Sequence, residues 1–233
     1  MDFTKNNVLI TDDQNKIDEA NAKNIPVIGF EHDGIKLSAR YIVLDEEALD
    51  DAFLEKVYRR TNKLPLYILE TNRTYVRELS VDDIDALFEL YEKQGITDFI
   101  EPLFPYEEEF EYEKKYIECV YEFYDYGMWL VFDKDTDKLI GRIGVENREE
   151  SAEIFTDEQS VEMGYIVAPE YQGSGIATEV CKAVIEYMIE EFSITRFTAR
   201  VNEKNVPSVK VIKKLGFSAT DVYADGERIF KLE

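Results

Sequence analysis

The chain has 233 residues, of which 45% are hydrophobic and 13% aromatic, and its 50 acidic against 27 basic side chains give a net charge of −23. This composition excludes a disordered chain and makes nucleic-acid binding unfavourable. Cys119 and Cys181 are too few cysteines for a disulfide scaffold or a zinc site, and no apolar run reaches the roughly 18 residues of a membrane span. The first residues lack a signal-peptide pattern. We therefore expect a cytoplasmic protein that binds no metal, nucleic acid or membrane.

The first 64 residues predict a small α/β layer. Short apolar runs predict strands, and acidic residues able to cap helices follow the first and the third of them. The strands are expected at 8–10, 26–30 and 41–44, with helices after Asp12–Asp13 and after 45–47. The order strand, helix, strand, strand, helix predicts a truncated Rossmann-like parallel layer, too small for a comfortable core of its own.

A break at 62–65 leads us to predict an accessory domain at 1–68 and a second domain at 69–233. The second domain mixes strands, helices and hairpins, which predicts an α/β (α+β) fold. Its strands are predicted at 74–79, 128–132, 139–145, 161–167 and 196–201, its helices from Ser80, over 112–124, from 177 and over 206–215, and a final hairpin around Asp225–Gly226.

The segment Gln172–Ala177, between a predicted strand and a long helix, indicates an anion site. Gly173 and Gly175 let backbone N–H groups approach a ligand closely, and a helix N-terminus adds unpaired donors and a positive dipole. Such a site suits a phosphate or pyrophosphate, and it works in an acidic protein because its donors are amides.

Two other phosphate motifs fit this segment poorly. The triphosphate loop fails because no lysine follows the glycine. The dinucleotide fingerprint is half met, since Thr178 stands where the third glycine belongs and five residues separate Val167 from Gly173. A simple helix-capping turn without a ligand is the remaining alternative.

A second motif begins at Asn205, where a short amphipathic helix leads to Gly216. Asn205 and Ser208 lie one turn apart, so their side chains can hydrogen-bond an extended ligand that carries amides. The alternatives are that Asn205 only caps the helix and that the nearby lysines form a solvated face. These lysines are Lys210, Lys213 and Lys214.

The order of these motifs over about 73–233 resembles the GNAT superfamily of N-acetyltransferases. The sequence from Glu162 to Gly173 is similar to the branch of that superfamily that includes the RimJ/RimL type and the spermidine acetyltransferases. The resemblance implies a mixed, strongly twisted sheet that splays open to admit acetyl-CoA. It implies a pyrophosphate loop of Gln172, Gly173, Ser174, Gly175, Ile176 and Ala177, a strand Ile166, Val167 and Ala168 whose backbone pairs with the pantetheine arm, and further cofactor contacts from Asn205 and Ser208.

The same resemblance implies direct attack of a primary amine on acetyl-CoA in a ternary complex, without a cysteine nucleophile. The only histidine, His32, lies outside this region, so the side-chain base must be a carboxylate, a tyrosine or a water relay. Glu162 stands near the position where several relatives keep a base; Glu146 is a weaker candidate, and a surface role for Glu162 is the alternative. Ile212 occupies the position of the usual tyrosine acid. The remaining candidates for the acid are solvent and Tyr165, Tyr171 and Tyr223.

The resemblance to the GNAT superfamily implies that the acceptor meets the segment joining the first two helices, here residues 95–112, where aromatic residues stand beside acidic ones. This composition suits a cationic amine, such as a polyamine, an aminoglycoside-like compound or a peptide amine. Core packing under a loop accounts equally well for the aromatic residues. A non-catalytic CoA-binding or protein-interaction module on the same fold is the alternative function for the whole domain.

Residues 8–30 resemble the tail of haloacid-dehalogenase-like α/β proteins. The nucleophilic aspartate and the lysine segments of that family have no counterpart here, so we expect no phosphatase activity. We interpret this segment as an accessory layer for docking, for formation of a homodimer or for regulation.

Overall fold

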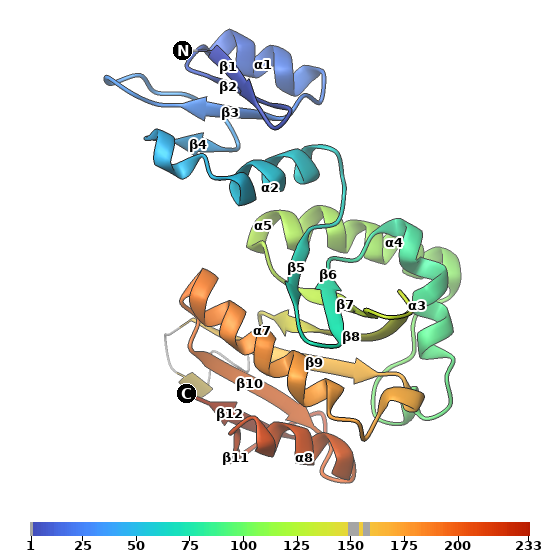
Figure 1. Cartoon of the computed structure of the whole chain (residues 1–233). Coiled ribbons are helices and arrows are strands. Elements are labelled where there is room, and N and C mark those ends of the chain that lie inside the picture. The colour runs from blue at the N-terminus through green and yellow to red at the C-terminus, as the bar shows by residue number, and fades with distance from the viewer. Residues whose placement is uncertain (1, 149–153, 156–158) are drawn as a thin grey trace. The chain divides into compact units, whose positions relative to one another are not determined.

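The computed structural model describes residues 2–148, 154–155 and 159–233. The chain divides into two compact units, Met1–Leu66 and Tyr67–Glu233, each with its own sheet (Figure 1). The first unit has a four-stranded sheet and the second an eight-stranded sheet.

The first unit contains the predicted parallel strands and one strand that the sequence did not reveal. The strands β2 (Val8–Thr11), β3 (Val27–Phe30) and β4 (Ile42–Val43) are parallel, whereas β1 (Asp2–Lys5) pairs antiparallel with β2. The purely parallel layer is therefore wrong at β1. Strand β1 lies at an edge of the sheet, where no apolar alternation is needed, so its sequence carries no pattern to predict it from.

Aspartates begin both helices of the first unit. The side chain of Asp13 accepts a hydrogen bond from Asn15 N before α1 (Gln14–Ala22), and that of Asp50 accepts one from Phe53 N before α2 (Asp51–Thr61). These bonds satisfy amides that a helix leaves without internal partners. The buried faces of the sheet and of α2 meet in a small apolar core that includes Ile10, Ile28, Leu54 and Val57.

The second unit is built on a mixed sheet in the order β11-β12-β10-β9-β8-β7-β6-β5. Only β9 and β10 are parallel; the other neighbours pair antiparallel. The strands are β5 (Tyr67–Glu70), β6 (Thr74–Arg77), β7 (Met128–Asp133), β8 (Leu139–Glu146), β9 (Ser160–Val167), β10 (Arg196–Val201), β11 (Ser218–Ala224) and β12 (Glu227–Leu232).

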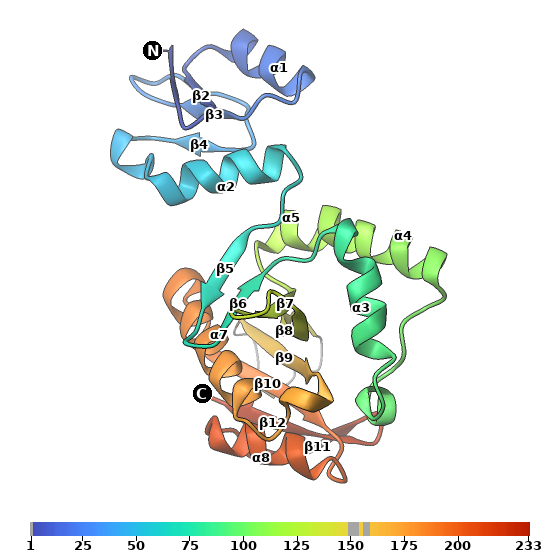
Figure 2. The ribbon, with the colours of Figure 1, turned by 45° about the vertical axis from the view of Figure 1, so that its right-hand side comes forward.

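Helices cover both faces of this sheet (Figure 2). The helices are α3 (Ile84–Tyr91), α4 (Tyr106–Tyr116), α5 (Glu122–Tyr124), α7 (Ile176–Phe192) and α8 (Val206–Lys214), and a π-helical turn over Ile117–Tyr121 joins α4 to α5. Helix α4 begins before the predicted residue 112, because Pro105 has a backbone suited to a helix start and three glutamates fill the first turn.

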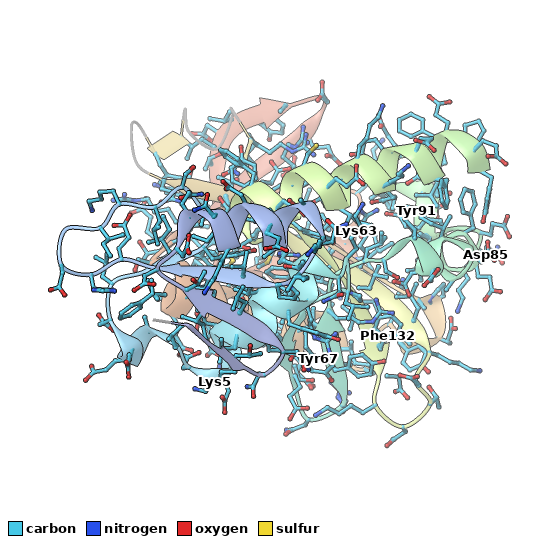
Figure 3. All side chains as sticks on the ribbon, turned by 90° about the horizontal axis from the view of Figure 1, so that it is seen from above. Lys5, Lys63, Tyr67, Asp85, Tyr91 and Phe132 are labelled. Atoms are coloured by element: carbon cyan, nitrogen blue, oxygen red, sulfur yellow. The ribbon has the colours of Figure 1, made fainter. Side chains whose placement is uncertain are left out.

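Strand β5, which the sequence did not reveal, is fixed at the edge of the sheet by stacked side chains. Tyr67 stacks on Tyr75 with ring centroids 5.3 Å apart, and Tyr75 stacks on Phe132 at 5.0 Å. The guanidinium of Arg77 lies 4.3 Å from the Phe132 centroid. Tyr67 and Phe132 can be located in Figure 3. Such cross-strand aromatic pairs stabilise a sheet, and here they join β5, β6 and β7.

A buried ion pair attaches α4 to the sheet. Arg142 on β8 lies 2.6 Å from Glu113 on α4, and the side chain of Glu113 is fully buried. Burial raises the pKa of Glu113, and the charge of Arg142 opposes that effect. Each charge therefore depends on its partner, because an isolated buried charge is costly.

We expect Arg142→Met to lower the free energy of unfolding by about 3–5 kcal/mol, because it leaves Glu113 buried without its cation. The double variant Arg142→Met/Glu113→Leu should lose less than the single variant, since no charge is left behind. Urea denaturation measures both. A double variant that is as unstable as the single one would show that the pairing is not what matters.

In the first unit, His32 bridges two acidic side chains beyond the carboxyl ends of β2 and β3. Its Nε2 lies 2.8 Å from Asp12 Oδ2 and its Nδ1 lies 3.2 Å from Asp33 Oδ2. Hydrogen bonding to Asp12, and then to Asp33, raises the pKa of His32 above its ordinary value of 6.5. Because the folded pKa is the higher one, the stabilisation is complete below the ordinary pKa and is lost as the pH rises through the raised pKa.

The single histidine gives one imidazole signal, so its titration can be followed by NMR without a competing residue. We expect a midpoint above 6.5 in the native chain, and a lower midpoint in Asp12→Asn. Asp13→Asn, whose side chain caps α1, is the control and should leave the midpoint in place. An unshifted midpoint in the native chain would contradict the bridging geometry.

Candidate active site

A cleft of about 580 Å³ lies beside the carboxyl-terminal half of β9. Its walls are the segment 95–100, the end of β9, the turn that follows β9, the start of α7, and one side of α8 with the residue before it. Ten of the residues that the sequence predicts for the site line it: Tyr165, Ile166, Val167, Gln172, Gly173, Gly175, Ile176, Ala177, Asn205 and Ser208. Glu162, Ala168 and Ser174 are not among the lining residues of this cleft.

The turn before α7 leaves helix amides without a side-chain cap. Gly175 occupies the N-cap position with φ of 89°, and no side chain accepts a hydrogen bond from the first turn. Gly173 also has a positive φ, of 72°, a conformation that only glycine adopts without strain. Gln172 Nε2 donates to the Val167 carbonyl at 2.9 Å, which holds the turn against the end of β9. The free first-turn donors can therefore serve an anion.

Cations that are distant in sequence contact this turn or line the cleft beside it. Arg73, in the turn between β5 and β6, donates from Nη1 to the Ser174 carbonyl at 3.0 Å and from Nε to Glu179 at 2.9 Å. Lys210 and Lys214 of α8 line the cleft itself. The sequence showed the lysines only as a basic cluster and gave no sign of Arg73, which lies about one hundred residues before the turn.

The pairing between β9 and β10 stops before either strand ends. The last paired residues are Glu162 and Thr198, whereas β9 continues to Val167 and β10 to Val201. This gap confirms the splayed sheet. The cleft lies along the open part of β9, where Tyr165, Ile166 and Val167 line it.

The ladder on the other side of β9 decides which backbone groups face the gap. The amide of Ala168 donates to the Ile140 carbonyl at 2.8 Å, so Ala168 turns its backbone groups toward β8. Alternate residues of an antiparallel strand turn the same way, so Ile166 also bonds toward β8. Tyr165 and Val167 instead turn their backbone groups toward the gap, where the Val167 carbonyl accepts the hydrogen bond from Gln172. The expectation that the backbone of Ile166 and Ala168 faces an extended ligand is therefore wrong in register.

A hydroxyl pair spans the cleft between β9 and α8. The Tyr165 hydroxyl lies 2.6 Å from Ser208 Oγ and donates to the Ser208 carbonyl at 3.0 Å. Burial raises the pKa of Tyr165. Asn205 caps α8, because its side chain accepts a hydrogen bond from Ser208 N at 3.2 Å, and it lines the cleft as well.

Glu162 lies at the inner end of the gap, in an ion-pair network. Arg200 Nε is 3.1 Å from Glu162 Oε1, and Arg148 Nε is 4.0 Å from the same oxygen. The side chain of Glu162 is 11% exposed. Glu162 and Tyr165 are three residues apart on a strand, so their side chains point to opposite faces of the sheet. Glu146 is paired with Glu162 in the ladder and accepts a hydrogen bond from the Tyr116 hydroxyl at 3.1 Å.

The other candidate residues for the proton steps lie in three different environments. Ile212 is fully buried in the core, so this position packs rather than reacts. Tyr171 lines the cleft. The hydroxyl of Tyr223 instead donates to Glu203 at 3.3 Å, and this side chain is exposed.

The segment 95–112 contributes less to the cleft than its composition suggests. Asp98 and Phe99 line the cleft, but Tyr106 packs on Phe88 and its hydroxyl donates to Asp85 at 2.7 Å. Glu109 is buried, and its Oε2 accepts a hydrogen bond from Phe104 N at 2.9 Å. Much of this segment therefore builds the fold.

Two further expectations concern metals and membranes. Among the residues that the structure describes, no group of three or more His, Cys, Asp or Glu side chains is arranged to hold a metal ion. Within the same residues, every helix is too short or too polar to cross a membrane.

Comparisons with known proteins agree with this geometry. The sequence profile of a GNAT acetyltransferase domain matches residues 73–218. The uncharacterized N-acetyltransferase YnaD of Bacillus subtilis is 28% identical over 149 residues, which are 64% of this chain and 81% of YnaD. The spermidine N(1)-acetyltransferase of Escherichia coli K12 is 32% identical over 69 residues, 30% of this chain and 37% of that enzyme.

Solved structures share the fold. A GNAT-family acetyltransferase from Bacillus anthracis is 20% identical and has a TM-score of 0.58, and the match covers 72% of this chain and 98% of that chain. RimL, a ribosomal L7/L12 alpha-N-protein acetyltransferase solved with coenzyme A, is 17% identical with a TM-score of 0.58, covering 71% of this chain and 97% of its own. The chain thus belongs to the GNAT family of acetyltransferases, enzymes that use acetyl-CoA as their acetyl donor.

Proposed function

We propose that the chain transfers the acetyl group of acetyl-CoA to a primary amine by direct attack in a ternary complex. The observation that carries this proposal is the gap between β9 and β10, which opens beside a helix N-terminus whose amides have no side-chain cap. An extended ligand with a diphosphate at one end fits both features.

In this proposal each part of the site has one task. The amides from Gly173 to Ala177 bind the diphosphate, and Lys210 and Lys214 add positive charge near it. The backbone of Tyr165 and Val167 pairs with the amide-bearing arm, as an added strand would. The side chains of Asn205 and Ser208 face the same arm from α8. Acetyl-CoA supplies an activated carbonyl carbon when it is bound.

The proton balance assigns roles to the residues at the inner end of the gap. The amine nitrogen forms a bond to the carbonyl carbon, and the bond from that carbon to sulfur breaks. The acceptor ammonium gives up two protons, one of which replaces the acetyl group on the sulfur. Glu162 accepts a proton through water, and the Tyr165–Ser208 hydroxyl pair is the nearest candidate donor within the cleft. The raised pKa of Tyr165 makes it a weak acid, so solvent remains the alternative donor.

The alternative function is a CoA-binding or interaction module without catalysis. Such a module would use the same turn from Gln172 to Ala177 but would not turn over acetyl-CoA. Release of free thiol from acetyl-CoA with a panel of primary amines separates the two. The RimJ/RimL-like branch and the docking, homodimer or regulatory role of the first unit also stay predictions. The E. coli relative named for spermidine supports an amine acceptor, but it matches only 30% of this chain.

We expect Gly175→Val to weaken coenzyme A binding by about tenfold or more, because a branched residue at positive φ displaces the amides of the turn. Isothermal titration with coenzyme A measures the effect. Gly226→Val is the matched control, since Gly226 also has a positive φ, of 81°, and no atom within 4 Å of an added Cβ. Equal affinity in Gly175→Val and the native chain would show that the diphosphate binds elsewhere.

We expect Glu162→Gln to lower kcat by about a hundredfold, because the amide cannot accept a proton. This is the lower end of the range for general bases, since the ion pair with Arg200 stabilises the charged carboxylate. Its affinity for coenzyme A should not change. Glu203→Gln removes another arginine-paired carboxylate, 3.1 Å from Arg228, and serves as the control. A native kcat in Glu162→Gln would remove this residue from the mechanism.

A further inference from the structure

A second cavity, of about 450 Å³, lies at the carboxyl end of β8, where Val145 and Glu146 line it. It shares no lining residue with the cleft. We call it the tyrosine cavity, because four tyrosines line it: Tyr112, Tyr116, Tyr124 and Tyr126. Tyr112 and Tyr116 come from α4, Tyr124 from α5, and Tyr126 from the loop before β7. The π-helical turn contributes Cys119 and Val120 to the wall. Such turns often occur at functional sites.

The tyrosine rings pack against one another in pairs, and hydrogen bonds hold some of the hydroxyl groups in fixed places. Tyr112 and Tyr116 have ring centroids 6.3 Å apart, and Tyr124 and Tyr126 have theirs 5.6 Å apart. The Tyr126 hydroxyl donates to Asn147 Oδ1 at 3.0 Å. The face of a tyrosine ring attracts an ammonium group and can stack on an apolar part of a ligand.

The charges of the cavity favour a ligand with both signs of charge. In the part of the chain that the structure describes, the cavity is lined by one carboxylate, Glu146, and by two cations, Lys115 and Arg148. Glu146 accepts hydrogen bonds from Tyr116 and from Arg148, the latter at 2.7 Å. A carboxylate has about four acceptor sites, so it can take an ammonium as well. A simple dication would meet more positive than negative charge here, whereas a zwitterion would find a partner for each of its charges.

One arginine links the cavity to Glu162, the residue that the proposed function makes the proton acceptor. Arg148 lies between Glu146, at 2.7 Å, and Glu162, at 4.0 Å. Glu146 and Glu162 are opposite each other in the ladder, so both side chains lie on the same face of the sheet. This is the point where β9 and β10 separate.

We propose that the tyrosine cavity holds the acceptor, and that the acceptor is an α-amino acid whose amine and carboxylate are both free. The amine lies between the tyrosine rings and Glu146, and the carboxylate faces Arg148 and Lys115. This inference rests on the proposed function, and it replaces the segment 95–112 as the place where the acceptor binds.

Occupancy of the cavity can be tested without catalysis. Cys119 is exposed and lines the cavity, whereas the other cysteine, Cys181, is buried. L-phenylalanine at about ten times its dissociation constant should slow alkylation of Cys119 by iodoacetamide about tenfold. Phenethylamine, which lacks the carboxylate, should protect much less. Absence of protection by L-phenylalanine, or equal protection by phenethylamine, would overturn the proposal.

Kinetics of acetyl transfer to L-phenylalanine provide a second test with a matched pair of variants. Tyr112 and Tyr106 lie on the same helix with side chains 47% and 45% exposed, and only Tyr112 lines the cavity. Tyr112→Ala and Glu146→Gln should each raise the KM for the amino acid about tenfold without changing the KM for acetyl-CoA. Tyr106→Ala should change neither.

The outcomes separate this inference from the proposed function. Protection of Cys119 without turnover of any amine supports the cavity as a binding site and contradicts the transferase function. Turnover of amines with a native KM in both cavity variants contradicts the cavity and leaves the transferase function standing. Faster turnover of diamines than of amino acids contradicts the proposed class of acceptor.

Discussion

The early end of the β9–β10 ladder determines how the second unit is built. Each of these strands is held by its other neighbour beyond that point: β9 by β8 as far as Val167, and β10 by β12 through Val201. These outer ladders hold the two strands in place along the gap. Backbone groups that face such a gap need partners, and an extended amide ligand provides them. The open sheet is therefore a property of the chain itself.

The turn from Gln172 to Ala177, which we call the anion turn, offers hydrogen-bond donors to a phosphate in a strongly acidic unit. Residues 65–233 carry a net charge of −19, which opposes the approach of a polyphosphate. Uncapped amides at the start of α7 offset this locally, because their partial charges act only within the first turn. Arg73, which is paired with Glu179, donates to a carbonyl of this turn, and Lys210 and Lys214 line the same cleft.

Local sequence patterns predicted the parts of the site that are continuous in the chain. The turn from Gln172 to Ala177 and the segment from Asn205 to Ser208 were visible, because glycine spacing and helix caps act over a few residues. Arg73 was not visible, because only the packing of the β5–β6 turn against α7 brings it there. The ladder parity that exposes Tyr165 and Val167 required the register with β8. No pattern within β8 or α4 indicated the buried pair of Arg142 and Glu113.

The same distinction applies to the fold. Alternating apolar residues predicted the interior strands and the hairpins, since one face of each is buried. The edge strands β1 and β5 escaped, because β5 is held by the rings of Tyr67 and Tyr75 rather than by burial of one face. The predicted helix over 112–124 missed the start of α4 at Tyr106 and the irregular turn inside it.

That irregular turn, Ile117–Tyr121, makes the second cavity a matter of chain length as much as of composition. A π-helical turn is closed by i→i+5 bonds and so holds one residue more than an α-helical turn, and removing a single residue here would restore the regular helix and take a lining position such as Cys119 or Val120 out of the cavity wall. The sheet and the coenzyme cleft would be untouched. A lineage of such chains could thus change what it acetylates by adding or losing one codon, while keeping the donor half of the enzyme intact.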